Sequence, residues 1–154
     1  MTAMVIGVGN PFRRDDGIGQ VVIERLRRHA PPGVRLALTD GEPARLLDLW
    51  DGTEVAVVID AVHRHDDPTP GRIHQVTVAR SVGREPAAAG SHGLGLGSAI
   101  DLALALDRMP GRLVLLAVEG GDFELGVGVS APVAAAADRL VDLVLRAVAV
   151  AADR

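Results

Sequence analysis

The stretch that decides the fold is Met4–Gly19, which reads Met-Val-Ile-Gly-Val-Gly-Asn-Pro-Phe-Arg-Arg-Asp-Asp-Gly-Ile-Gly. Its first three residues form an apolar run of the length expected for one buried strand. Gly7 and Gly9 then allow the backbone to turn tightly and leave room for another group to approach it. Asp15 and Asp16 follow, just before the point where a helix is expected to begin. The stretch therefore predicts a strand–loop–helix junction that carries two adjacent acids.

Two adjacent acids at such a junction call for an explanation. Aspartate is favoured at helix N-caps and at the positive end of the helix dipole. One of the pair, Asp15 or Asp16, is therefore expected to cap the helix. The other is left free for chemistry.

Length and composition predict a single domain that spans residues 1–154. The chain has 154 residues, of which 48% are hydrophobic, and this is enough to bury a sizeable core. No apolar run reaches the ~18 residues of a membrane span, so we expect no membrane partner. The N-terminus enters the first strand without a signal-peptide pattern, and cysteine is absent. These features lead us to expect a cytoplasmic protein.

The residue types that are missing exclude several mechanisms. The chain has no Cys, Lys or Tyr, so a thiol nucleophile, a Walker A lysine, a Schiff base and a tyrosine acid are all excluded. The net charge of −4 argues against nucleic acid as a partner.

Apolar runs and helical periodicities alternate along the rest of the chain. Further strands are expected at Val34–Thr39, Val55–Ile59, Arg72–Val78 (an edge strand) and Leu113–Val118, and helices at Gly17–His29, Pro43–Trp50, Ser98–Met109 and after Ser130. This order predicts an α/β fold, a three-layer sandwich. Its sheet is expected to be mostly parallel, five-stranded and phosphorylase/hydrolase-like, with helices on both faces.

Three acids lie shortly after predicted strands. Ligands in such sheets bind beyond the carboxyl ends of the strands, and Asp16, Asp40 and Asp60 all lie just past those ends. If the first and third strands are neighbours, Asp16 and Asp60 share one crevice. His92 lies on the long Gly- and Ala-rich loop before the third major helix, which can reach the same edge.

Two carboxylates and one imidazole at one sheet edge resemble an incomplete metal site. Aspartate oxygen and neutral histidine nitrogen suit zinc, nickel or cobalt, and three protein ligands leave positions open. The alternative is that the acids are caps or turn formers and the histidine is solvated. A second possible metal site contains His63, His65, Asp66 and Asp67, a segment that we interpret as a solvated loop.

The opening motif resembles the N-terminal signature of the hydrogenase maturation endopeptidases. These enzymes cut the C-terminal extension from the large subunit of nickel-iron hydrogenases once nickel is in place. The resemblance covers nearly the whole chain, and its other matching motifs are Asp40-Gly41, Val57-Val58-Ile59-Asp60-Ala61, Ser91-His92 and Ser130-Ala131-Pro132-Val133.

The resemblance implies both an activity and a set of site residues. By it, Asp16, Asp60 and His92 contact nickel, and Asp40 is a further functional acid beside the catalytic carboxylates Asp16 and Asp60. The nickel is borne by the partner, a nickel-iron hydrogenase large-subunit precursor, so no permanently bound metal is expected. Because no serine stands in a nucleophile-elbow context, water is the expected nucleophile.

The chain departs from the family pattern at two places. Asp16 stands where some members carry the longer Glu. Glu42-Pro43 follows Asp40-Gly41 where many members have Gly-Thr, a difference that bears on the role of this loop and on substrate choice.

Two other classes of protein share part of the opening motif. A non-catalytic Rossmann-like nucleotide-binding module would begin with Gly7-Val8-Gly9, but Phe12 stands in place of the third glycine, and the acid pair would repel a pyrophosphate. A peptidyl-tRNA-hydrolase-like hydrolase has a related fold and a Gly-x-Gly-Asn-Pro start. Its Arg-His-Asn segment is replaced here by Arg-Asp-Asp, and the acidic charge does not suit tRNA.

Overall fold

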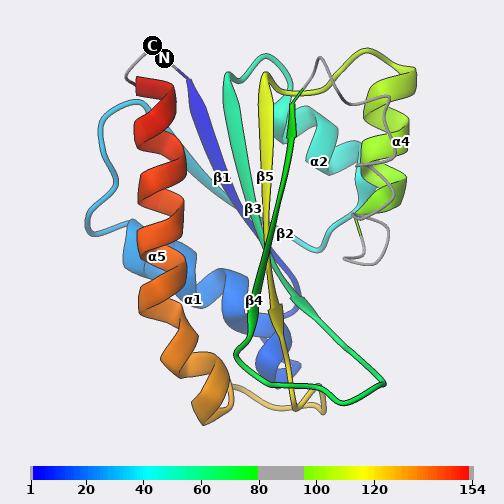
Figure 1. The fold of residues 1–154 in the computed structure, drawn as a ribbon, viewed down its shortest axis with the longest axis vertical. Coiled ribbons are helices and arrows are strands. Elements are labelled where there is room, and N and C mark those ends of the chain that lie inside the picture. The colour runs from blue at the N-terminus through cyan, green and yellow to red at the C-terminus, as the bar shows by residue number, and fades with distance from the viewer. Residues whose placement is uncertain (1, 80–95, 153–154) are drawn as a thin grey trace.

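The computed structural model describes residues 2–79 and 96–152, which form one five-stranded sheet with helices on both faces (Figure 1). The strands are β1 (Ala3–Val8), β2 (Val34–Thr39), β3 (Val55–Val62), β4 (Ile73–Ala79) and β5 (Arg112–Glu119). The helices are the 3-10 helix η1 (Arg14–Gly17) and the α-helices α1 (Ile18–Leu26), α2 (Pro43–Trp50), α4 (Gly97–Ala105) and α5 (Ala131–Ala152). Across these described ranges, no helix combines the length and the hydropathy that crossing a membrane requires.

The sheet has the strand order β2-β1-β3-β5-β4. Strands β2, β1, β3 and β5 are parallel to one another, and β4 is antiparallel to β5 at the edge. The register places Val5 of β1 beside Leu36 of β2 on one side and Val57 of β3 on the other. The predicted α/β class, the mostly parallel sheet and the edge strand are thereby confirmed.

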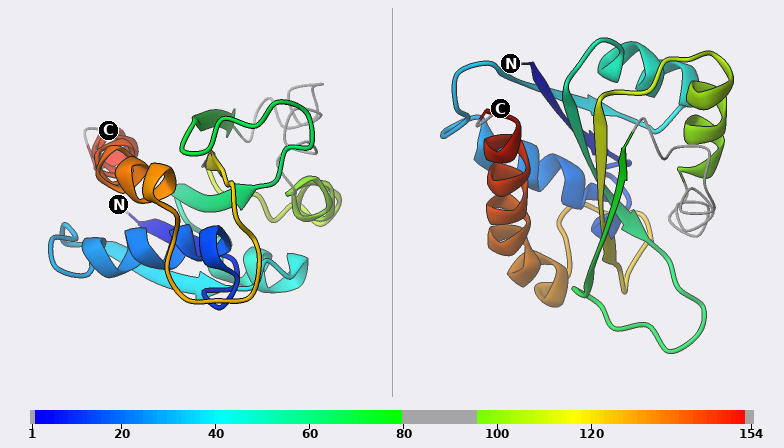
Figure 2. Two further views of the ribbon diagram at one scale, coloured as in Figure 1. Left: turned by 90° about the horizontal axis from the view of Figure 1, so that it is seen from below. Right: turned by 45° about the horizontal axis from the view of Figure 1, so that its top comes forward.

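The helices form two outer layers. Helices α1 and α5 cover one face of the sheet, and α2 and α4 cover the other (Figures 1 and 2). Alternate residues of the central strands feed two apolar cores: Val5 and Val57 pack toward α1 and α5, whereas Ile6 and Val58 pack toward α2 and α4. Because the central strands are buried on both faces, they read in the sequence as continuous apolar runs.

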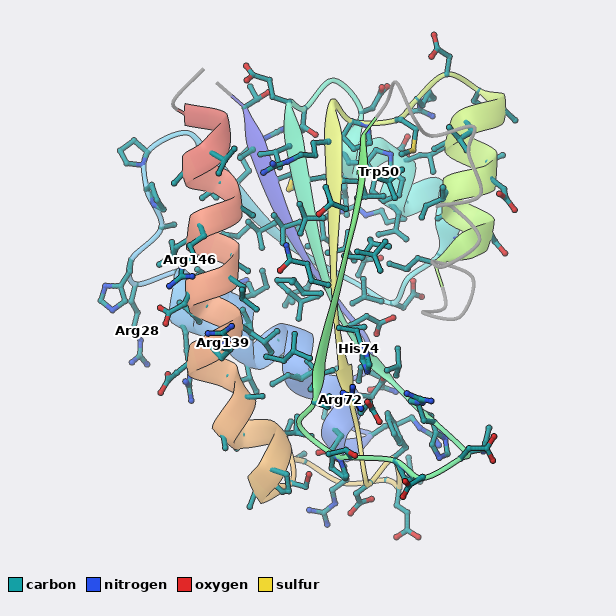
Figure 3. The ribbon with its side chains drawn as sticks, viewed as in Figure 1. Arg28, Trp50, Arg72, His74, Arg139 and Arg146 are labelled. Atoms are coloured by element: carbon teal, nitrogen blue, oxygen red, sulfur yellow. The ribbon has the colours of Figure 1, made fainter. Side chains whose placement is uncertain are left out.

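Trp50, the single tryptophan, lies in the core on the α2–α4 side (Figure 3). Its side chain is fully buried, and its indole Nε1–H donates a 2.9 Å hydrogen bond to the backbone oxygen of Arg108. The indole therefore fills space in the core and also satisfies its polar group.

Several element boundaries differ from the sequence prediction; helix α1, for example, ends at Leu26 and not at His29. Strand β3 continues past Ile59 to Val62, because it stays paired with β5 through Glu119, so Asp60 lies within the strand and not just past it. Helix α4 ends at Ala105 and does not reach Met109. The chain leaves that helix through Asp107, which adopts a left-handed φ of 53°.

The strand order reverses between β1 and β3. From β1 the chain crosses through α1 to β2 on one side, and from β2 it crosses back through α2 to β3 on the other side of β1. This is the topological switch point of the sheet, the place where open α/β sheets bind their ligands. The carboxyl ends of β1, β3 and β5 lie at the lower edge in Figure 1.

The glycines of the opening stretch let the chain pack against itself. A Cβ at Gly9, whose φ is 136°, would lie 2.1 Å from the backbone oxygen of Asp16. A Cβ at Gly7 would lie 2.6 Å from the backbone oxygen of Gly19. The space expected for an approaching group is thus filled by η1 and the start of α1, which are drawn tightly against the end of β1.

Candidate active site

Asp16 lies in η1, at the carboxyl end of β1, and is half-buried. Its Oδ2 accepts a 2.8 Å hydrogen bond from the backbone N–H of Asn10. The expected capping role is wrong: the N-cap of α1 is Gly17, and neither η1 nor α1 receives a side-chain cap. The carboxylate of Asp16 is instead held at the rim of the switch point.

Asp15, the neighbouring acid, has a structural role that the sequence did not predict. Its side chain is 0% exposed and accepts hydrogen bonds from the backbone N–H groups of Ser130 (2.6 Å), Gly121 (2.7 Å) and Asp122 (2.9 Å), and from the Ser130 hydroxyl (2.9 Å). Burial raises the pKa of Asp15, but these four donors outweigh burial and hold the pKa below its usual value. We call these four residues the Asp15 cluster; it ties η1 to the loop between β5 and α5.

Asp60 lies on β3, directly beside β1, as the sequence argument required. Burial, and then the nearby charge of Asp16, raise the pKa of Asp60 to about 7. The two carboxyl groups are therefore close enough at the switch point for their charges to interact. We call Asp16 and Asp60 the switch-point pair.

Asp40 follows β2, one strand beyond β1, and is exposed. Its Oδ1 accepts a 3.1 Å hydrogen bond from the N–H of Glu42, so it forms the turn that leads into α2. Its loop adjoins the opening stretch, since the N–H of Gly9 donates to the backbone oxygen of Thr39 at 3.0 Å. Asp40 therefore lies at the same sheet edge but outside the switch-point pair.

The Glu42-Pro43 departure has a local structural reason. Glu42 is the N-cap of α2, and its carboxylate accepts hydrogen bonds from the N–H groups of Ala44 (3.1 Å) and Arg45 (2.9 Å). Pro43 occupies the first turn, where it costs no hydrogen bond. These two residues begin the helix.

His92 lies outside the described residues, so its predicted place beside the pair stays a prediction. Within residues 2–79 and 96–152, no group of three or more His, Asp or Glu side chains is arranged to hold a metal ion. This statement includes the segment His63–Asp67, the second possible metal site. There, the ring of His63 stacks on Phe123 with a centroid distance of 4.9 Å.

Glu119 is a buried acid at the same edge that the sequence analysis did not single out. Its side chain is 1% exposed, and its Oε1 accepts a 3.0 Å hydrogen bond from the N–H of Thr69. Its Oε2 lies 2.6 Å from Nε2 of His74, a residue of β4 that is labelled in Figure 3. The Thr69 N–H and His74 lower the pKa of Glu119, assisted by Arg64. The available signal was its position, because Glu119 follows an apolar strand run just as Asp60 does.

The switch-point pair has the electrostatics of an acid–base couple. Two carboxyl groups that share a crevice resist carrying two charges, so one retains a proton to a higher pH. A group with a pKa of about 7 can accept or donate a proton near neutral pH, which is the requirement for general acid–base catalysis.

The family model described as "Hydrogenase maturation protease" matches residues 21–147. The chain belongs to this family. The hydrogenase expression/formation protein HupD of Thiocapsa roseopersicina is 31% identical over 119 residues, which are 75% of this chain and 53% of HupD. The chain thus spans about half the length of that curated relative.

Solved structures of endopeptidases and peptidases of hydrogenase maturation share the fold. The hydrogenase maturating endopeptidase HybD from E. coli superposes with a TM-score of 0.77 at 22% identity, covering 98% of this chain and 94% of HybD. The hydrogenase 2 maturation peptidase from Thaumarchaeota archaeon SCGC_AB-539-E09 gives a TM-score of 0.73 at 25% identity, covering 96% of this chain and 98% of that one. The hydrogenase maturation protease fold therefore extends over nearly the whole chain.

Proposed function

We propose that this protein is an endopeptidase that removes the C-terminal extension of a nickel-iron hydrogenase large-subunit precursor after nickel insertion. The observation that carries the proposal is the switch-point pair, Asp16 and Asp60, at the ligand-binding edge of a chain that belongs to the hydrogenase maturation proteases. Relatives with this fold are called endopeptidases of hydrogenase maturation.

In this proposal nickel arrives as part of the substrate. Asp16, Asp60 and His92 contact it and so place the scissile bond, and Asp40 assists from the neighbouring loop. Nickel polarises the scissile carbonyl, and a carboxylate of the pair accepts a proton from the attacking water. In this proposal the protein is a peptidase that uses aspartates and forms no covalent bond to its substrate.

The raised pKa of Asp60 gives a reason for selecting the nickel-loaded precursor. Near neutral pH the pair retains a proton for part of the time. A nickel ion favours the fully ionised pair and displaces that proton, because metal ligands must be deprotonated. A nickel-free precursor offers no such gain and is bound more weakly.

The test is incubation of the protein with nickel-loaded and with nickel-free precursor, followed by mass measurement of the products. Only the nickel-loaded precursor should be shortened. Asp16→Asn and Asp60→Asn should each reduce the rate by about 100-fold or more while folding normally. Asp66→Asn is the control, because it changes an exposed acid at the same edge. Processing of both precursors at equal rates, or loss of activity in the Asp66 variant alone, would contradict the proposal.

His92 has a separate test that depends on protonation. A nickel-contacting imidazole must be neutral, and an unperturbed histidine titrates near ~6.5. Binding of the nickel-loaded precursor should weaken as pH falls through this value, and His92→Ala should weaken binding at neutral pH. If the binding curves of the wild type and His92→Ala overlap between mildly acidic and neutral pH, His92 does not contact the nickel.

A further inference from the structure

Three large apolar residues near the candidate active site are exposed to solvent. Phe12 is 64% exposed, Leu125 is 78% exposed and Val127 is 73% exposed. Phe12 belongs to the loop after β1, and the other two belong to the loop between β5 and α5. We call these three residues the rim surface. Leaving them in water is unfavourable unless a partner covers them.

The two loops of the rim surface are held together by backbone hydrogen bonds. Arg13 and Gly126 form a parallel β-bridge. The N–H of Gly126 donates to the oxygen of Phe12 at 2.8 Å, and the N–H of Arg14 donates to the oxygen of Gly126 at 3.1 Å. This bridge places Phe12 beside the segment that carries the other two side chains. Figure 2, left, shows the loop between β5 and α5 passing over the blue segment that follows β1.

The Asp15 cluster also holds the loop between β5 and α5 against η1. The carboxylate of Asp15 accepts hydrogen bonds from Gly121 and Asp122 near one end of the β5–α5 loop and from Ser130 at the other end. The loop is thus anchored at both ends and bridged in the middle. A surface that is ordered beforehand loses little conformational entropy when it binds.

The rim surface is continuous with the switch-point pair. The N–H of Phe12 donates to Oδ1 of Asn10 at 2.9 Å, and the N–H of Asn10 donates to Oδ2 of Asp16 at 2.8 Å. A protein substrate whose scissile bond reaches Asp16 therefore also comes close to the loop that carries Phe12. Val127 also lines a groove of about 400 Å³ whose lining includes Val21 and Arg28.

We propose that the rim surface docks an apolar patch of the hydrogenase large-subunit precursor, with one apolar side chain of that patch in the groove beside Val127. The inference rests on the proposed function for the identity of the partner. The rim surface supplies binding energy away from the reacting bond, so it governs the affinity for the precursor more than the rate of cleavage.

The test compares Leu125→Asp, Val127→Asp and the double variant with the wild type. Leu106→Asp is the matched control, since Leu106 is 53% exposed but follows α4, away from the rim surface. KM for the nickel-loaded precursor should rise at least about tenfold in each rim variant, with kcat nearly unchanged, and should stay constant in the control. An unchanged KM in the double variant would overturn the inference.

Two further measurements separate the other outcomes. If the wild type does not cleave the precursor, the proposed function fails, and direct binding of the precursor to immobilised protein then decides the role of the rim surface. Binding that is lost in the double variant supports it, whereas equal binding or none overturns it. Light scattering after gel filtration tests whether a second copy of the chain covers the surface. A wild-type dimer that dissociates in Leu125→Asp, with KM unchanged, would also overturn the inference.

Discussion

Asp15 and Asp60 lie at the same edge of the sheet, but the fold shifts their pKa values in opposite directions. In the Asp15 cluster, a wholly buried carboxylate is surrounded by four hydrogen-bond donors, and its pKa is lowered. In the switch-point pair, Asp60 is partly buried, its main electrostatic neighbour is another acid, and its pKa rises to about 7. Burial disfavours the charge in both places; the hydrogen-bond donors outweigh it at Asp15, whereas at Asp60 burial is the main cause of the raised pKa and the charge of Asp16 adds to it.

The comparison separates a structural acid from a chemical one. The ionised form of Asp15 is stabilised by fixed donors, so the fold gains from keeping it charged. The ionised form of Asp60 is disfavoured, so the folded protein loses stability when Asp60 ionises. Asp60 therefore exchanges its proton near neutral pH. Adjacent positions in the sequence, Asp15 and Asp16, thus belong to two different kinds of site.

The largest expected effect comes from Asp15→Asn. The amide keeps the shape but loses the charge and turns an NH₂ group toward backbone donors, so the free energy of unfolding should fall by about 3–5 kcal/mol at pH 7. The lowered pKa means that this stabilisation exists above the unfolded pKa of ~3.9 and disappears as pH falls through the folded value, so the difference should shrink in acid. Urea unfolding measures both. Asp16→Asn is the control, and equal losses in the two variants would contradict the comparison.

Asp60→Asn should change the pH dependence of stability. The folded pKa of Asp60, about 7, lies above the unfolded value, so the folded protein holds the proton more tightly and wild-type stability falls as pH rises from ~4 to ~7. The variant lacks this loss and should gain roughly 3–4 kcal/mol relative to the wild type between pH 4 and pH 8. Thermal or urea unfolding at several pH values tests this, with Asp66→Asn as the control. Parallel profiles for the wild type and Asp60→Asn would refute it.

Glu119→Gln probes a third acid, which resembles Asp15 and not Asp60. Glu119 is buried, accepts from Thr69 and contacts His74, and its pKa is lowered. Its neutral amide should reduce the free energy of unfolding by about 1–3 kcal/mol, less than Asp15→Asn, because fewer donors are involved. Chemical denaturation gives the value. A loss equal to that of the Asp15 variant would show that the number of donors does not set the effect.

Asp16→Asn should have the smallest effect on stability, below about 1 kcal/mol, because Asp16 is half-buried and accepts one hydrogen bond from Asn10. The substitution should instead change the pKa of the neighbouring Asp60. Without the negative charge of Asp16, the pKa of Asp60 should fall, while burial keeps it above the usual aspartate value. Carboxyl carbon NMR across a pH titration reports this directly. An unchanged pKa of Asp60 would show that the two groups are not electrostatically coupled.

Local signals in the sequence were sufficient for several elements. Strand β2 and helix α2 begin and end at the predicted residues, Val34–Thr39 and Pro43–Trp50. Pro43 favours the first helical turn, and Asp40-Gly41 favours a turn after the strand. The residues next to the end of β2 and to the start of α2 therefore predict both boundaries. The α/β class followed from the alternation of such elements, and the position of Asp16 and Asp60 at one sheet edge followed from the class.

Other features depended on contacts between distant residues. The sequence could state that Asp16 and Asp60 meet only if the first and third strands are neighbours, and the pairing of β1 with β3 decided this. The extension of β3 to Val62 also depended on its pairing with β5, which overrides local propensity.

The sequence by itself indicated that Asp16, Asp40 and Asp60 lie near the carboxyl edge of the sheet, because acids that follow apolar strand runs form a local pattern, but it did not single out Glu119. Only the tertiary structure decided what each acid does there. The hydrogen-bond donors of Asp15 lie 106, 107 and 115 residues further along the chain, and the pKa of Asp60 is raised by burial in the fold and by the charge of Asp16 in η1. A carboxyl group takes its pKa and its role from the groups that surround it in space, and those groups are assembled only when the sheet and the β5–α5 loop have formed.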